Sequence, residues 1–145
     1  MDIAQCIAQI STIWQGQPGA SEPSLDDIER HTRLALPADF REFMRWSDGG
    51  AAKFPRVYLS LWSSSKVIDL NRDYQFNRYL GDRVIAIGSD GGPICFLLDF
   101  RSSDNPVFAS VNFGDLDPAE IKQVAPTFTG AVELALSGQL DDDAL

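Results

Sequence analysis

Residues 83–100, RVIAIGSDGGPICFLLDF, contain two apolar runs separated by a short polar turn. Each run, Arg83 to Gly88 and Ile94 to Phe100, has the length and the β-branched content of a buried strand. The intervening Asp90-Gly91-Gly92 favours a tight hairpin, because glycine tolerates the positive φ that such turns require. Strands joined by so short a turn pair antiparallel, so this stretch predicts an antiparallel sheet.

Upstream of the hairpin, residues 36–50, LPADFREFMRWSDGG, carry the periodicity of an amphipathic helix. Pro37 suits a first helical position, where its missing N–H needs no partner. The Gly49-Gly50 pair is expected to end the helix in a left-handed conformation. Asp39, near the helix N-terminus, is expected to contribute only a small electrostatic stabilisation. The apolar face, which predicts core packing, consists of Leu36, Phe40, Phe43 and Met44, with Trp46 following.

The remaining elements complete a single α+β domain over residues 1–145. Period-two alternation predicts a strand over residues 54–62, with Val57, Leu59 and Leu61 buried. Helical spacing over residues 65–80 predicts that Tyr74 and Tyr79 are buried, and Ser63 heads a cluster that could cap this helix. The other expected elements are a helix over 2–15, a loop over 16–23, a helix from Ser24, a strand over 107–111, a short helix at 117–120 and a last helix from Thr127.

The chain is acidic, with 12 Lys and Arg against 21 Asp and Glu and a net charge of −9. Repulsion from phosphates argues against nucleic-acid partners and anionic membrane surfaces. No apolar run reaches the roughly 18 residues that a membrane helix needs. The N-terminus does not resemble a secretory signal, so we expect a cytoplasmic protein whose Cys6 and Cys95 stay reduced.

No constellation of catalytic or metal-ligating residues emerges. His31 is the single histidine, lies in a charged helix and has no serine or cysteine motif beside it. The Gly88–Gly92 segment lacks the Lys-Ser/Thr of a phosphate-binding loop, and Pro93 follows it instead. Asp115 and Asp117 lack the glycine and terminal glutamate of a calcium loop. We therefore expect no enzyme activity, no cofactor and no metal.

Two segments in this order and spacing resemble the SUKH superfamily, the Smi/Knr cell-wall-assembly-regulator-like proteins. The first combines the acidic helix of residues 25–29 with the Leu-Pro-x-Asp-Phe helix start and its Gly-Gly end. The second is the Ile-Gly-x-Asp-Gly-Gly hairpin before a strand ending near Asp99. The resemblance spans residues 24–137, leaves residues 1–23 uncovered and departs from the pattern at Pro93. Its motif residues are structural: Leu36, Pro37, Phe40, Phe43, Gly49, Gly50, Ile87, Gly88, Asp90, Gly91 and Gly92.

The resemblance implies a cytosolic immunity protein that neutralises a cognate bacterial toxin by direct binding. A regulatory or scaffold module of the Smi/Knr type is the alternative, and an unrecognised hydrolase a minor one. Because many delivered toxins act on nucleic acid and are basic, an acidic inhibitor would associate with them quickly.

Candidate partner-binding residues are Trp46, Trp62, Asp115, Asp117 and Glu120. Aromatic side chains ringed by polar groups make good interface anchors, while rim charge mainly sets association rates. The acidic tail, residues 139–145 with Asp141–Asp143, adds to this charge. The competing interpretation is that both tryptophans are core residues and that the tail is disordered and solvated.

Overall fold

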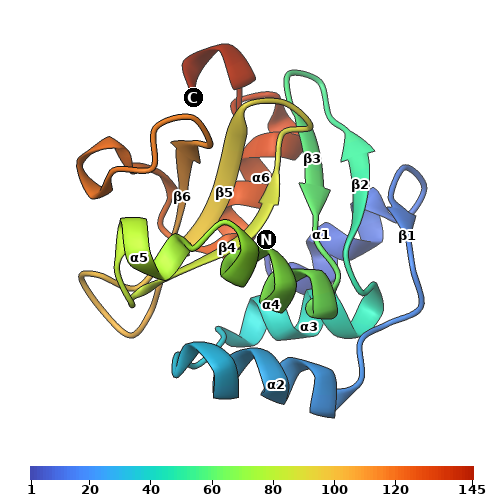
Figure 1. Cartoon of the computed structure of the whole chain (residues 1–145). Coiled ribbons are helices and arrows are strands. Elements are labelled where there is room, and N and C mark those ends of the chain that lie inside the picture. Colours follow the sequence, from blue (N-terminus) through green and yellow to red (C-terminus); the bar gives the residue numbers. More distant parts are fainter.

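The computed structural model describes all 145 residues and is built on one seven-stranded sheet. Neighbouring strands are antiparallel throughout and follow each other in chain order, which confirms the α+β fold and the antiparallel sheet (Figure 1). The strands are β1 Gln15–Gly16, β2 Gly50–Lys53, β3 Tyr58–Leu61, β4 Val84–Ser89, β5 Ile94–Asp99, β6 Val107–Asn112 and β7 Lys122–Ala125.

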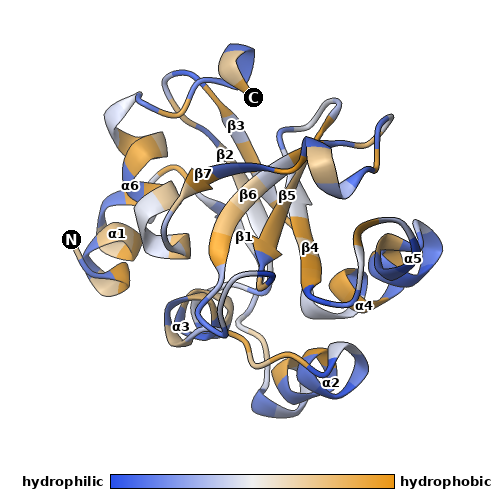
Figure 2. Ribbon diagram, turned by 90° about the vertical axis from the view of Figure 1, so that its left-hand side faces the viewer, coloured by the Kyte–Doolittle hydropathy of each residue, from blue (hydrophilic) through white to orange (hydrophobic).

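Helices cover both faces of this sheet, but unequally. On one side α1, α3 and α6 pack against each other, with α6 against β6 and β7, whereas α5 lies on the other side and α4 runs beside β4 (Figure 2). The helices are α1 Ile3–Ile10, α2 Glu22–Thr32, α3 Ala38–Trp46, α4 Ser64–Asp73, α5 Phe76–Leu80 and α6 Phe128–Ser137, with short 3₁₀ turns η1 Pro118–Glu120 and η2 Asp142–Ala144.

The hydrophobic core is divided by the sheet into two clusters of very different size. The first contains 30 buried residues, among them Phe40, Phe43 and Phe128 from the helices and Ile87 from β4. The second contains only eight, mostly small side chains of β4 to β6 under Phe76 and Leu80. Because the second cluster is thin, the aromatic side chains at its margin remain partly exposed.

The hairpin between β4 and β5 forms as predicted. The Asp90 carboxylate accepts hydrogen bonds from the backbone N–H groups of Gly92 and Ile94, at 2.8 and 3.1 Å, and so closes the turn. Gly91 has a φ of 81°, whereas Gly92 has no positive φ. Gly88 lies where β4 meets β3, and a side chain there would collide with the Ser60 carbonyl.

Replacing Gly91 with valine is therefore expected to destabilise the protein by about 1–2 kcal/mol, the cost of a left-handed L-residue. A Cβ at this position would also lie 2.9 Å from the Tyr58 ring. Gly92→Val is the matched control, since its Cβ would come no nearer than 3.5 Å to another group. Urea denaturation compares the two, and equal losses would contradict the assignment of the turn.

Several predicted helix boundaries were wrong. The N-terminal helix ends at Ile10 rather than continuing to residue 15, and α2 begins at Glu22, capped by Ser21, so the loop before it is shorter than expected. Residues 64–80 form two helices, because Gln75 adopts a left-handed conformation with φ 56°. That break turns Tyr74 and Tyr79 outward, and they are 45% and 46% exposed rather than buried.

The roles expected of Pro37 and of the Gly49-Gly50 pair also need correction. Pro37 is the N-cap of α3, one residue before its first helical position. The helix ends at Trp46, and Ser47 follows in an extended conformation. The two glycines do have positive φ, but they lead into β2, a strand the sequence did not predict.

Arginine side chains on α3 hold the acidic helix α2 in place. Arg41, only 14% exposed, forms ion pairs with Glu22, Asp26 and Glu29 at 2.7, 2.9 and 3.3 Å. Arg45 also pairs with Glu22. Hydrogen bonds from Arg45 and Arg41 lower the pKa of Glu22 from 4.5 to about 2.

This lowered pKa predicts how stability depends on pH. The stabilisation from ionised Glu22 is complete above pH 4.5 and is lost as the pH falls towards 2. The free energy of unfolding of Glu22→Gln should therefore fall less steeply over that interval than that of the wild type. Urea melts at a series of pH values test this, with exposed Glu42→Gln as the control. Parallel curves for Glu22→Gln and the wild type would refute it.

Candidate functional site

Three aromatic side chains form a partly exposed ledge at the margin of the second core cluster. Trp62 follows β3, Tyr74 follows α4 and Phe113 follows β6, so three separate elements contribute to it. The Phe113 ring centroid lies 5.3 Å from that of Tyr74 and 6.5 Å from that of Trp62. Tyr74 also stacks on buried Phe76 at 5.5 Å, which holds its exposed ring in place. We call Trp62, Tyr74 and Phe113 the aromatic ledge.

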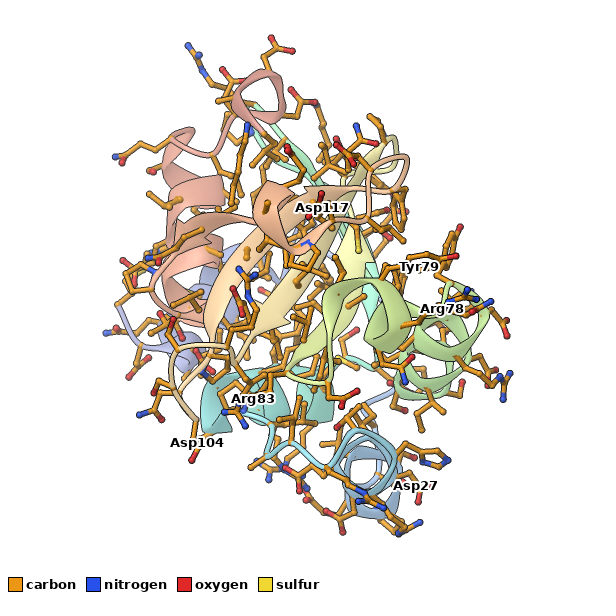
Figure 3. The ribbon with its side chains drawn as sticks, turned by 60° about the vertical axis from the view of Figure 1, so that its left-hand side comes forward. Asp27, Arg78, Tyr79, Arg83, Asp104 and Asp117 are labelled. Atoms are coloured by element: carbon orange, nitrogen blue, oxygen red, sulfur yellow. The ribbon has the colours of Figure 1, made fainter.

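The predicted acidic residues lie on the connection between β6 and β7, residues 113–121, which we call the acidic connection. Asp115, Asp117 and Glu120 are all exposed, and Figure 3 shows Asp117 on this connection, in the upper middle of the view. Asp117 accepts a hydrogen bond from the Ala119 N–H at 2.9 Å and so caps η1. Through Phe113 the structure therefore brings Trp62 close to the acidic connection.

Trp46 is not part of this arrangement. Its ring packs edge-on against Phe43 with centroids 5.4 Å apart, at the end of α3. It is partly buried against the first core cluster rather than the second. Of the two predicted tryptophans, only Trp62 belongs to the aromatic ledge.

A trough of about 670 Å³ lies beside Trp62, over the part of the sheet formed by β1 to β3. Its lining is mainly polar and includes Ser60, Lys66 and Asp48. The Asp48 carboxylate accepts hydrogen bonds from the N–H and hydroxyl of Ser64, at 2.7 and 3.2 Å, so it fixes the start of α4. Asp48 thus has a structural partner, and the trough extends the surface next to the ledge.

The C-terminal acidic segment lies against the β2–β3 hairpin. Leu140 is buried, Asp141 pairs with Arg56 at 3.1 Å, and the Asp142 N–H donates to the Arg56 carbonyl. The pKa of Asp141 is lowered by the hydrogen bond from the Asp143 N–H and by Arg56. The carboxylates of Asp141 to Asp143 can all approach within 4.8 Å of one another.

This segment lies at the same end of the sheet as the acidic connection. Leu145 lines a small pocket of about 100 Å³ together with Asp115, Glu120 and Lys122. The last residue of the tail thus lies beside the connection, and we call the acids of the tail and of the connection together the acidic end.

Neither cysteine has the properties of a reactive thiol. Burial raises the pKa of the Cys95 thiol far above its usual range and also raises that of Cys6. Both therefore stay protonated and act as apolar side chains. His31 is exposed at the end of α2, where its Nδ1 lies 2.8 Å from the Asp27 carbonyl.

Sequence reasoning missed two members of the ledge. Tyr74 was assigned to the core because the break at Gln75 was not foreseen, and Phe113 was not singled out. The signal available was its position between the end of a strand and Gly114-Asp115, a turn sequence that leaves an aromatic residue at the edge of the sheet.

The geometry defines an α+β domain whose antiparallel sheet is heavily packed on one face and bears an aromatic and acidic surface beside the other. No helix is long and apolar enough to cross a membrane. Residues 19–133 match the SMI1 / KNR4 family (SUKH-1), and the chain belongs to that family. No curated protein matches the sequence.

Proposed function

We propose that this protein is a cytoplasmic immunity protein that neutralises a cognate bacterial toxin by direct binding, without catalysis. Membership of the SUKH-1 family supports a protein of this type. The single observation that carries the proposal further is the aromatic ledge, whose Phe113 begins the connection that bears exposed Asp115, Asp117 and Glu120. Aromatic anchors beside a charged rim are the usual composition of a protein-binding surface.

The ledge is suited to binding because its rings are already held in place. The Tyr74 ring contacts both Phe76 and Phe113, with centroids 5.5 and 5.3 Å away, so little side-chain freedom remains to be lost on association. The carboxylates beside it and the net charge of −9 favour a basic partner surface. The toxin domain we propose is therefore basic and contributes apolar side chains to the ledge.

Growth protection tests the proposal directly. If the gene for this protein has a toxin gene as its neighbour, that toxin is expressed in a sensitive host with and without the protein. We expect protection by the wild type, loss of protection with Trp62→Ala or Tyr74→Ala, and full protection with Tyr79→Ala, whose exposed ring lies outside the ledge. Absence of both protection and a stable complex would refute the proposal.

The acidic end should set the rate of association. We expect Asp115→Asn with Glu120→Gln, and separately Asp142→Asn with Asp143→Asn, to slow association several-fold at low ionic strength and to weaken its salt dependence, with little change in dissociation. The control is Glu42→Gln with Asp82→Asn, which removes the same charge elsewhere. Measuring the association rates at two ionic strengths tests whether the acidic end speeds binding. Unchanged rates in both acidic-end variants would remove this surface from the proposal.

A further inference from the structure

One cleft is lined by more basic than acidic residues, unlike the protein as a whole. It lies between the end of α2, the side of α4 and the turn from α5 into β4, and has a volume of about 620 Å³. Arg33, Arg72 and Arg83 line it together with His31, and Asp82 is its one carboxylate. The lining residues thus sum to a formal charge of +2 with His31 neutral, in a chain whose net charge is −9, and the carboxylates paired with Arg72 and Arg83 lie outside the lining.

The three guanidinium groups are available to a ligand to different degrees. Arg33 is the C-cap of α2, its backbone fixed at φ 60°, and its side chain forms no hydrogen bond or ion pair within the chain. Arg72 is bound only to exposed Asp69 and Asp73, at 3.4 and 3.3 Å. Exposed ion pairs are weak, so a more strongly charged ligand can displace such partners.

Arg83 is held in place by a backbone contact. Its Nε donates to the Phe100 carbonyl at 2.8 Å, which fixes the direction of the guanidinium plane. Its Nη2 pairs with Asp104 at 2.8 Å, and Figure 3 shows the two side chains next to each other. The Asp104 side chain is 96% exposed, so this pair too is open to competition from an anion.

These observations define the chemistry of a ligand. Arginine forks bind phosphate and carboxylate groups with paired hydrogen bonds, which a lysine cannot reproduce. Three such groups around one cleft suit a ligand with more than one negative charge. A volume of about 620 Å³ exceeds the need of a single phosphate and lies in the range of small-molecule sites.

We propose that this cleft binds a small, multiply charged oxyanion through Arg33, Arg72 and Arg83. This site is separate from the aromatic ledge and does not depend on the proposed toxin partner. The ligand bears phosphate or carboxylate groups, and His31 and Asn77, which also line the cleft, offer further polar contacts.

Titration of the whole protein with inorganic pyrophosphate and, separately, with citrate tests the proposal. We expect saturable amide chemical-shift changes around residues 31–34, 71–72 and 82–84, and the tighter probe shows whether phosphate or carboxylate is preferred. Arg33→Gln and Arg72→Gln should each weaken binding about tenfold or more, as expected for a lost charged hydrogen bond. Calorimetry at low and at physiological ionic strength gives the affinities.

Arg56→Gln is the matched control, because Arg56 is exposed and pairs with Asp141 much as Arg83 pairs with Asp104. It should bind both probes like the wild type. The proposal is wrong if neither probe gives saturable shifts at the cleft, or if Arg56→Gln weakens binding as much as the cleft variants do. Thermal melts of each variant separate a lost ligand contact from a lost fold.

Discussion

Phe40→Ala is expected to lower the free energy of unfolding by about 3–5 kcal/mol, the cost of a cavity left by a large core side chain. Phe40 is fully buried on α3 and packs edge-on against Phe128 of α6, with ring centroids 5.2 Å apart. No small shift of either helix can fill the space, because α1 also packs against both of them. Urea denaturation measures the loss, and an unchanged m-value would show that stability falls without a change in the surface exposed on unfolding.

The neighbouring residue provides the contrast. As a charge near a helix N-terminus, Asp39 would contribute roughly 0.3–1 kcal/mol. In the structure its carboxylate also accepts hydrogen bonds from the N–H and hydroxyl of Thr129, at 2.9 and 2.7 Å. We therefore expect Asp39→Ala to cost about 1.5–3 kcal/mol, still less than Phe40→Ala. A loss for Phe40→Ala no larger than that for Asp39→Ala would contradict the packing of α3 described above.

Features encoded by neighbouring residues were predictable from the sequence. The β4–β5 hairpin formed as expected because Asp90 and Gly91 determine the turn without help from the rest of the chain. The same holds for α6, whose N-cap is Thr127, where the sequence predicts its start, and whose C-cap is Gly138 in a left-handed conformation. Local hydrogen bonds and backbone preferences decide such elements, so periodicity and turn chemistry identify them.

Features that depend on distant partners were not predictable. The strands β1, β2 and β7 have two to four residues each, too few for a period to emerge, and they exist because a neighbouring strand pairs with them. The bond between Asp39 and Thr129 joins residues 90 positions apart. No pattern among the neighbouring residues indicates this hydrogen bond, although the Leu-Pro-x-Asp-Phe motif does place an aspartate at position 39.

The candidate site likewise has one part that the sequence predicts and one part that depends on distant contacts. Composition alone indicated the acidic end, because charge is visible without a fold. The aromatic ledge depends on Gln75, whose left-handed backbone ends α4 and turns Tyr74 towards Phe113. Glutamine gives little warning of that conformation, which glycine and asparagine adopt more readily. Trp46 and Trp62 looked equivalent in the sequence and were separated only by the packing.

An asparagine side chain takes the place of a missing strand along β4. The β3 strand pairs with β4 only at Gly88 and Ser89, and the Trp62 N–H reaches the Ile87 carbonyl. Beyond that point Asn71 of α4 accepts from the Ala86 N–H at 3.0 Å and donates to the Ala86 carbonyl at 2.8 Å. Its amide reproduces both hydrogen bonds of a strand partner, so α4 closes the open edge of a buried strand.

Asn71→Ala should therefore cost about 2–5 kcal/mol, because it leaves the N–H and the carbonyl of fully buried Ala86 without partners. Asn77→Ala on α5 removes the same side chain from an exposed position with no hydrogen bond and should change stability by less than about 0.5 kcal/mol. Urea denaturation gives both values, and amide exchange at Ala86 adds a local readout, since that N–H should lose protection in Asn71→Ala alone. Unchanged stability together with a still-protected Ala86 amide would mean that another group, and not Asn71, satisfies the edge of β4.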